Sequence, residues 1–134
     1  MKANKQLIVS SVFLALTTPT FANDVVTKLL QEYHSQAAQP FTVDAGRQLW
    51  IKTYTNASGD NRSCTTCHTN DPKQVGKHVR TGKRIEPMAP SVNPERFIKE
   101  QEIRKWLTRN CKWTLSRECN AQEKGDLLTY LNSL

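Results

Sequence analysis

The feature that most constrains this chain is a run of five residues, Cys64-Thr65-Thr66-Cys67-His68. Two cysteines separated by two residues and followed at once by histidine form the attachment sequence for c-type haem. On a helical turn Cys64 and His68 share a face, so both thiols and the imidazole can reach one cofactor from one short segment. We therefore predict one covalently bound haem c, attached to Cys64 and Cys67, with His68 as the proximal iron ligand.

Two other interpretations of the paired cysteines are less consistent with the sequence. A thioredoxin-like dithiol lies in a strand–helix–strand unit, but no segment of this sequence shows the alternating pattern of a strand. A structural zinc site requires a second pair of ligands, but Cys111 and Cys119 have no neighbouring histidine and are widely spaced. The spacing of the motif therefore favours haem over a redox dithiol or zinc.

Residues 1–22 have the organisation of a signal peptide. Lys2 and Lys5 precede a largely apolar run over residues 7–16, and small residues lead to Ala22, after which we expect cleavage. The run is shorter than the roughly 20 residues of a membrane-spanning helix, which disfavours the alternative of a permanent N-terminal anchor. We expect export to the periplasm and no membrane span after cleavage.

Export determines the chemistry of the other two cysteines. In an oxidising compartment, cysteines outside a cofactor motif can pair. We predict a disulfide between Cys111 and Cys119 that closes a loop between two helices, with a redox-active pair as the alternative.

The charge of the chain bears on its partners. Residues 1–22 contain two lysines and no acidic residue, so the formal net charge of +7 falls to +5 for residues 23–134. A basic domain favours an acidic protein partner through electrostatic steering of the encounter. The basic residues are scattered among prolines and helices without a nucleic-acid-binding motif, so we expect no nucleic acid partner.

Hydrophobic spacing predicts an all-α chain, and 134 residues are enough for one folded domain. Four prolines between residues 69 and 94 exclude a long helix there and indicate an irregular basic loop. Asn93 before Pro94, and Asn120 three residues before Glu123, resemble helix starts. The predicted helices cover residues 24–34, 43–54, 94–110 and 120 onward.

Three features outside the motif extend the argument to a family. Gly46 and Trp50 in an early helix, with Tyr130 in the final helix, together with the haem motif resemble class I c-type cytochromes. In that family the early glycine lets the first core helix cross closely over the aromatic residue of the last. The resemblance implies a class I cytochrome c fold over residues 43–134, with an extra N-terminal helix and linker at 23–42.

Eight stretches of the C-terminal half carry a closer resemblance: residues 76–78, 81–83, 85–90, 93–97, 105–106, 109–112, 117–119 and 123–126. They are similar to the sphaeroides haem protein group within these cytochromes. That resemblance implies a monohaem, high-spin cytochrome with a disulfide near the haem. It also implies an asparagine as the sixth ligand, by position Asn93, that leaves on reduction and opens the iron to oxygen or nitric oxide.

The residues by themselves leave the sixth ligand open. The ordinary class I expectation is a methionine sulfur, and Met88 lies between prolines in the loop after the motif. A thioether on the iron would give a closed, electron-carrying centre, whereas an amide oxygen would give an open one. Asn93 can also be interpreted as a helix cap only, and His78 or no protein ligand is a third alternative.

We therefore expect a periplasmic monohaem cytochrome that accepts electrons from a partner and binds a diatomic gas at ferrous iron. The family resemblance implies a dihaem cytochrome c or a membrane cytochrome b as that partner. The alternative is a simple electron-transfer cytochrome ligated by Met88. Enzymatic turnover stays open, because no acid–base group can be assigned above the distal face from the sequence.

Overall fold

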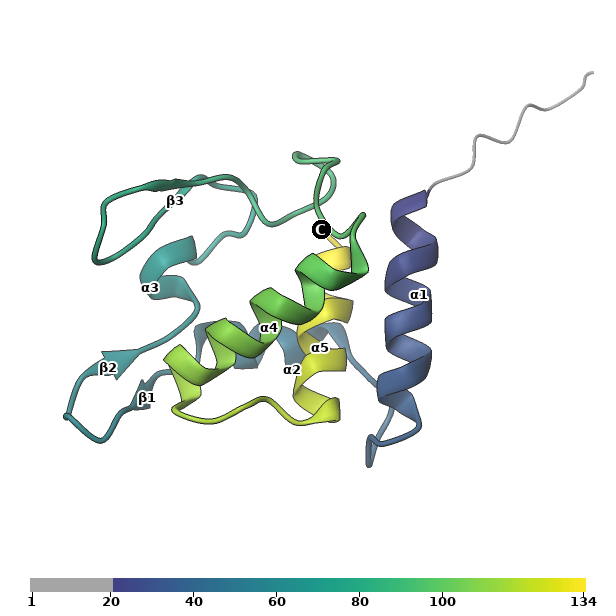
Figure 1. Cartoon of the computed structure of the whole chain (residues 1–134), viewed down its shortest axis with the longest axis horizontal. Helices are drawn as coiled ribbons and strands as arrows, with labels where there is room; N and C mark the ends of the chain where they lie inside the picture. Colours follow the sequence, from purple (N-terminus) through teal and green to yellow (C-terminus); the bar gives the residue numbers. More distant parts are fainter. Residues whose placement is uncertain (1–20) are drawn as a thin grey trace, which may run out of the picture.

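The computed structural model describes residues 21–134, and this part of the chain is mostly helical (Figure 1). Its helices are α1 (Phe21–His34), α2 (Val43–Ile51), α3 (Thr65–His68), α4 (Glu100–Leu115) and α5 (Ala121–Asn132). Within the described range, no helix has the length and apolar character needed to cross a membrane. Most of the predicted signal peptide, residues 1–20, lies outside the described residues.

Two short antiparallel strand pairs accompany the helices. They are β1 (Tyr54–Thr55) with β2 (Asn61–Arg62), and β3 (Gly76–Lys77) with β4 (Arg84–Ile85). The all-α prediction therefore holds only in a coarser form: the described residues are mostly helical, and the two short strand pairs were not predicted. Strands of two residues are too short to show an alternating pattern, so hydrophobic periodicity does not reveal them.

The core is built where α2 crosses α5. A Cβ placed on Gly46 would lie 2.1 Å from the carbonyl oxygen of Asp126 and 2.5 Å from the Cβ of Tyr130. Only a residue without a side chain allows two backbones to approach so closely. One turn later Trp50 packs edge-on against Tyr130, with 6.3 Å between ring centroids. The predicted close crossing of an early helix over the aromatic residue of the last one is confirmed.

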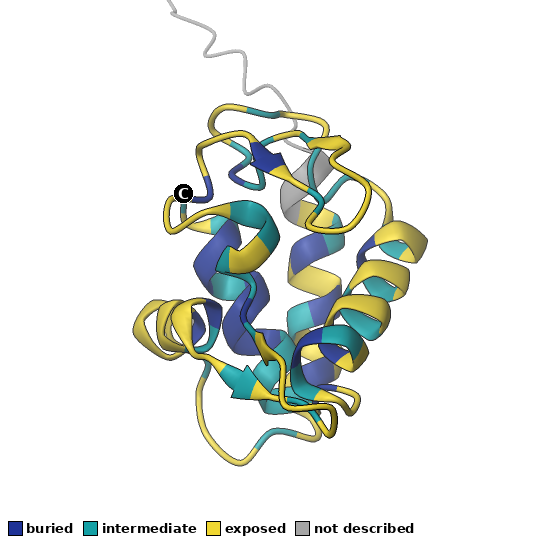
Figure 2. Ribbon diagram, turned by 90° about the vertical axis from the view of Figure 1, so that its left-hand side faces the viewer, coloured by how far each residue is buried: buried dark blue, intermediate teal, exposed yellow. Residues whose placement is uncertain are grey.

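Helix α1 packs against α5 and α4 through a second apolar cluster. Figure 1 shows α1 on one side of the molecule, and α3 with both strand pairs on the other. Figure 2 shows that the buried positions of the helices alternate with exposed ones along each helix. The buried residues of this cluster are Val26, Leu29, Tyr33, Ile103 and Leu128. At its exposed edge, Arg104 pairs with Glu32 and Glu100. Exposed ion pairs contribute little, so the apolar contacts hold α1 in place.

Two predicted helices differ from the structure in their bounds. The helix predicted over 43–54 ends at Ile51, where the chain turns into β1. The helix predicted over 94–110 instead begins at Glu100 and ends at Leu115. Its start is displaced because Phe97 has a φ of 63°, a left-handed conformation that interrupts a helix. Phe97 contacts both apolar clusters, and this packing offsets the strain.

The predicted start of the last helix is confirmed. The side chain of Asn120 accepts a hydrogen bond from the Glu123 amide at 2.9 Å, and the Asn120 amide donates to the Glu123 carboxylate at 3.0 Å. These reciprocal bonds form a capping box, which satisfies amide groups that the first helical turn leaves without partners. That α1 is an addition to a minimal class I core stays a prediction, as does the domain boundary at residue 43.

Candidate haem site

The haem motif folds as one helical turn. Cys64 directly precedes α3, and the amide of His68 donates to the Cys64 carbonyl at 3.1 Å. Ser63 fixes the start of the turn, because its amide donates to the Thr66 hydroxyl at 3.0 Å. The helical spacing expected for the motif is therefore present, and Cys64, Cys67 and His68 come from one short segment.

The end of the motif is held against the α2–α5 core. The indole Nε1 of Trp50 donates to the carbonyl of Thr69 at 3.1 Å, and its ring centroid lies 5.4 Å from that of His68. Thr69 has a φ of 65°, so the chain changes direction immediately after the histidine. Trp50, predicted only as part of the helix crossing, also positions the proposed proximal ligand.

Gly76 brings the β3–β4 pair onto the motif. A Cβ at this position would lie 2.2 Å from the Cys67 carbonyl oxygen and 3.1 Å from the His68 Cα. A residue with any side chain would therefore push β3 away from α3. In the sequence, Gly76 stands out only as part of the family resemblance. Its burial and the two-residue strand that it begins are visible only in the structure, so no local sequence signal indicates this contact.

The electrostatics of the motif suit metal coordination by a neutral imidazole. Burial, with a smaller effect from the positive charge of Arg96, lowers the pKa of His68 to about 4. Burial raises the pKa of the Cys64 thiol to about 12. His68 is therefore neutral at pH 7, the form that binds iron. Cys64 and Cys67 are both free thiols, and together with the neutral imidazole they form a donor set that fits a haem c.

Asn93 lies in an irregular segment before α4. Its side-chain Nδ2 donates to the Pro87 carbonyl at 3.0 Å, and its backbone amide donates to the carbonyl of the fully buried Ala89 at 3.0 Å. The interpretation of Asn93 as a cap of the following helix is wrong, because α4 begins at Glu100 with Lys99 as its N-cap. The side-chain oxygen of Asn93 accepts no hydrogen bond from residues 21–134.

The two alternative sixth ligands occupy different environments. Met88 is half-buried and packs against the core cluster that also contacts Cys64, while its amide donates to the Pro72 carbonyl at 2.8 Å. His78 lies near the turn between β3 and β4, where its Nδ1 accepts from the Thr81 amide at 3.2 Å. That bond gives His78 a local structural role. Met88 and Asn93 therefore lie in the same irregular segment before α4, whereas His78 lies in the β3–β4 hairpin.

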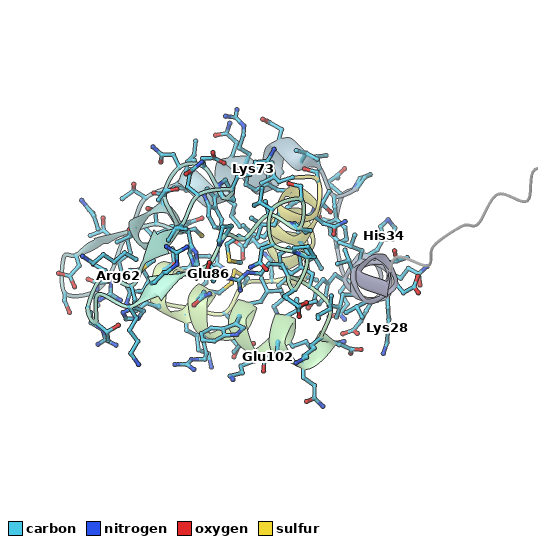
Figure 3. The ribbon with its side chains drawn as sticks, turned by 90° about the horizontal axis from the view of Figure 1, so that it is seen from above. Lys28, His34, Arg62, Lys73, Glu86 and Glu102 are labelled. Carbon is cyan, nitrogen blue, oxygen red and sulfur yellow. A yellow bond between two sulfur atoms is a disulfide. The ribbon has the colours of Figure 1, made fainter. Side chains whose placement is uncertain are left out.

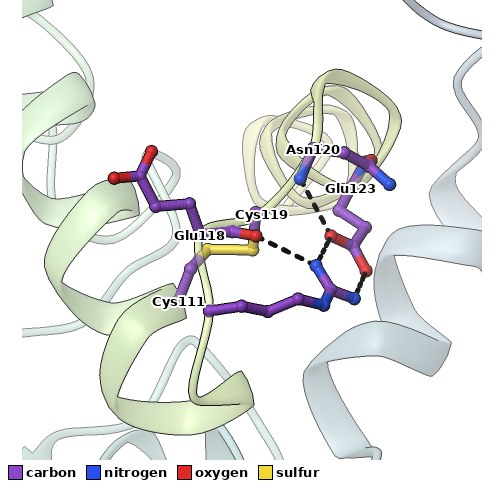
Figure 4. The surroundings of a disulfide bond; sticks show 6 residues. Cys111, Glu118, Cys119, Asn120 and Glu123 are labelled. Atoms are coloured by element: carbon purple, nitrogen blue, oxygen red, sulfur yellow. Dashed lines mark hydrogen bonds and ion pairs between the residues drawn. A yellow bond between two sulfur atoms is a disulfide. The ribbon is translucent and has the colours of Figure 1, made fainter.

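Cys111 near the end of α4 and Cys119 before α5 form a disulfide in the structure (Figure 4), with 5.5 Å between their Cα atoms. Both are buried in the core cluster that contacts Cys64. Beside them, the Arg117 guanidinium donates to the Glu118 carbonyl at 3.0 Å and pairs with Glu123 at 2.7 Å. The predicted pairing is geometrically satisfied, and its position restrains the connection between the last two helices.

Replacing both disulfide cysteines with serine should destabilise the protein without removing haem. Closing a loop of this length contributes roughly 2 to 3 kcal/mol to the free energy of unfolding in the chain-entropy model. Denaturant unfolding of Cys111→Ser/Cys119→Ser measures the loss, and an Arg117→Lys variant controls for the surrounding contacts. Alkylation of the denatured, unreduced wild-type protein at Cys111 or Cys119 would contradict the disulfide.

The zinc alternative receives no support from the side chains. Across residues 21–134, no three side chains of His, Cys, Asp or Glu come together in a way that could hold a metal ion. The two pairs of cysteines are used separately, one pair in the motif and one in the disulfide. The second ligand pair that a structural zinc site requires is not assembled in this part of the chain.

A helical core closed by Gly46, and a Cys-X-X-Cys-His turn held against it, define a c-type cytochrome. The curated proteins similar to this chain agree. The cytochrome c-type protein SHP of Cereibacter sphaeroides is 41% identical over 126 residues, covering 93% of this chain and 95% of that protein. Cytochrome c'' of Methylophilus methylotrophus is 34% identical over 121 residues, covering 87% of this chain and 83% of that protein. The chain is a member of the SHP family of c-type cytochromes.

Solved structures show the same relationship. Oxidised SHP, described as an oxygen-binding cytochrome c, superposes with a TM-score of 0.75 at 40% identity, over 81% of this chain and 96% of that one. Oxidised cytochrome c'' gives a TM-score of 0.71 at 34% identity, over 84% and 93%. A family model described as "Domain of unknown function (DUF1924)" matches residues 36–131. Homology to these cytochromes implies that the cofactor is haem c.

Proposed function

We propose that this chain is a periplasmic monohaem cytochrome that accepts an electron and binds a diatomic ligand at ferrous iron after Asn93 has left. The observation that carries the proposal is the orientation of the Asn93 amide. Its Nδ2 is bonded to the Pro87 carbonyl at 3.0 Å, and no described residue donates to its oxygen. An asparagine held by its nitrogen presents its oxygen as a ligand.

A covalently bound haem would supply an iron that changes oxidation state and binds small molecules. Cys64 and Cys67 would hold it, and His68 would be the proximal ligand. The amide oxygen of Asn93 is a hard, weak donor, so it would hold ferric iron better than ferrous iron and would be loosened by reduction. Asn93 lies outside α4 and α5, and it can therefore move without breaking a helix. Neighbouring Pro90 and Pro94 limit how far the backbone follows.

The electron donor in this proposal is an acidic redox protein, either a dihaem cytochrome c or a membrane cytochrome b. Exposed cations gather on the segment from Lys73 to Arg84 that packs on the motif, and Figure 3 labels Lys73. Arg84 pairs with Glu86 at 2.7 Å. The remaining cations of the segment have no ion-pair partner among residues 21–134 and are available to an acidic surface. They are Lys73, Lys77, Arg80 and Lys83.

Absorption spectra of the oxidised, reduced and carbon-monoxide-treated protein test the proposal. Asn93→Val should abolish the native ferric spectrum, because valine offers no donor atom, while the reduced protein should still bind carbon monoxide. The matched Met88→Ala variant should keep the native ferric spectrum. Loss of that spectrum in the methionine variant alone would exclude Asn93 as the ligand.

A simple electron shuttle ligated by Met88 is the second candidate. The half-buried position of Met88 against the cluster that contacts Cys64 favours it. This candidate predicts a sulfur-to-iron charge-transfer band in the oxidised protein and slow uptake of carbon monoxide after reduction. An oxygen- or nitric-oxide-reducing activity would further require a positioned acid–base group, and no described contact places one beside Asn93.

A further inference from the structure

We propose that Arg96 is a positioning residue for Asn93, acting through the Pro87 carbonyl that both side chains share. The Nε of Arg96 donates to the Pro87 carbonyl at 2.8 Å, and its Nη2 donates to the Glu86 carbonyl at 2.6 Å. The same Pro87 oxygen accepts from Asn93 Nδ2 at 3.0 Å. The inference rests on the proposed function, because it assigns Arg96 to the ligand that Asn93 provides there.

The environment of Arg96 differs from that of the exposed arginines. Arg104 and Arg117 pair with carboxylates at the surface. Arg96 is half-buried, and burial lowers the pKa of its guanidinium. It makes no ion pair with residues 21–134, and its described bonds go to two backbone carbonyls. Burying a charged guanidinium costs free energy, and here the described bonds that compensate for it go to two backbone carbonyls. This indicates that Arg96 serves to hold those carbonyls in place.

The shared carbonyl explains how the guanidinium orients the amide. A carbonyl oxygen has two lone pairs, and here one donor is charged and anchored while the other belongs to Asn93. Arg96 also bonds to the carbonyl before it, so consecutive peptide groups at Glu86 and Pro87 are held by one planar side chain. With the acceptor held in place, the Asn93 nitrogen keeps its partner and the oxygen stays directed away from it.

The loop that carries Asn93 is also tied to the chain that follows the motif. Met88, which comes directly after the Pro87 carbonyl held by Arg96, donates its amide to the Pro72 carbonyl at 2.8 Å. The Met88 side chain packs against the core cluster that also contacts Cys64. Arg96 therefore fixes the loop next to the point where it is bonded to the segment after the motif.

Two binding rates test whether Arg96 positions Asn93 or only stabilises the loop as a whole. They are the rate of imidazole binding to the ferric holoprotein and the rate of carbon monoxide binding to the ferrous holoprotein. Imidazole has to displace Asn93, so Arg96→Lys and Arg96→Gln should accelerate its binding about tenfold, the loss expected for a charged hydrogen bond. Carbon monoxide meets iron that Asn93 has already left, so its binding rate should change less than about twofold, within the effect of one weak contact. The matched control Arg104→Gln should change neither rate.

Unchanged imidazole binding in folded Arg96→Lys would overturn the inference, as would equal acceleration of both ligands or the same effect in Arg104→Gln. If Arg96→Gln fails to retain haem, the charge-conserving lysine variant decides. In an Asn93→Val background, Arg96→Lys should have no further effect on imidazole binding, because the side chain that it positions is gone. A native ferric spectrum in Asn93→Val would instead reject the proposed function, whatever the arginine variants show.

Discussion

Protein carrying Cys64→Ala together with Cys67→Ala is expected to contain no covalently bound haem. Both sulfurs that form the thioether bonds are removed, and the disulfide leaves Cys111 and Cys119 unable to replace them. His68 alone provides one coordination bond, which denaturation breaks. Haem staining after denaturing electrophoresis measures the result, and the expected change is from full staining to none.

The disulfide variant Cys111→Ser/Cys119→Ser is the matched control, since it also removes two cysteines but should keep the stain. Haem staining in the Cys64→Ala/Cys67→Ala protein after denaturation would mean that the cofactor is attached elsewhere. Staining in neither double variant would mean that the disulfide is required before attachment. The pair of variants therefore assigns each pair of cysteines to its role.

Gly46→Val is expected to destabilise the fold strongly. The first side-chain carbon alone would lie 2.1 Å from the Asp126 carbonyl oxygen, and this neighbour is backbone that cannot rotate away. Helices α2 and α5 would have to separate, which would also disturb Trp50 and Tyr130. Overpacking of a core costs typically 1 to 3 kcal/mol, and we expect about 3 kcal/mol or more for a clash with backbone. Denaturant unfolding monitored by helix content measures it.

Gly59→Asn serves as the matched control for the loss of a glycine. Gly59 has a φ of 84°, and nothing lies within 4 Å of a Cβ at that position. Asparagine tolerates the left-handed conformation better than other side chains, so the free energy of unfolding should fall by less than about 1 kcal/mol. Equal stability of Gly46→Val and wild type would contradict the close crossing of α2 and α5.

Two of the parts that were predicted correctly depend on short-range rules. The turn at Cys64–His68 follows from the spacing of its residues, and the capping box at Asn120 and Glu123 follows from local hydrogen bonding. The crossing at Gly46 was predicted from the family resemblance, and the absence of a side chain explains it physically. In each case a few residues determine the geometry.

The parts that were missed depend on contacts between distant residues. Phe97 adopts a positive φ because two apolar clusters receive its ring, and nothing in the local sequence indicates this. That conformation displaces the start of α4 and frees Asn93 from a capping role. Gly76 against Cys67, and Arg96 on the carbonyl before Met88, likewise join residues whose proximity the sequence pattern does not encode.

Helix α5 links the two apolar clusters of this molecule. It contacts both α1 and α2, and it contributes Leu131 to one cluster and Leu128 to the other. A change that loosens α5 therefore removes contacts from both clusters at once. The helices that pack on α5 are expected to unfold together with it, in a single cooperative transition.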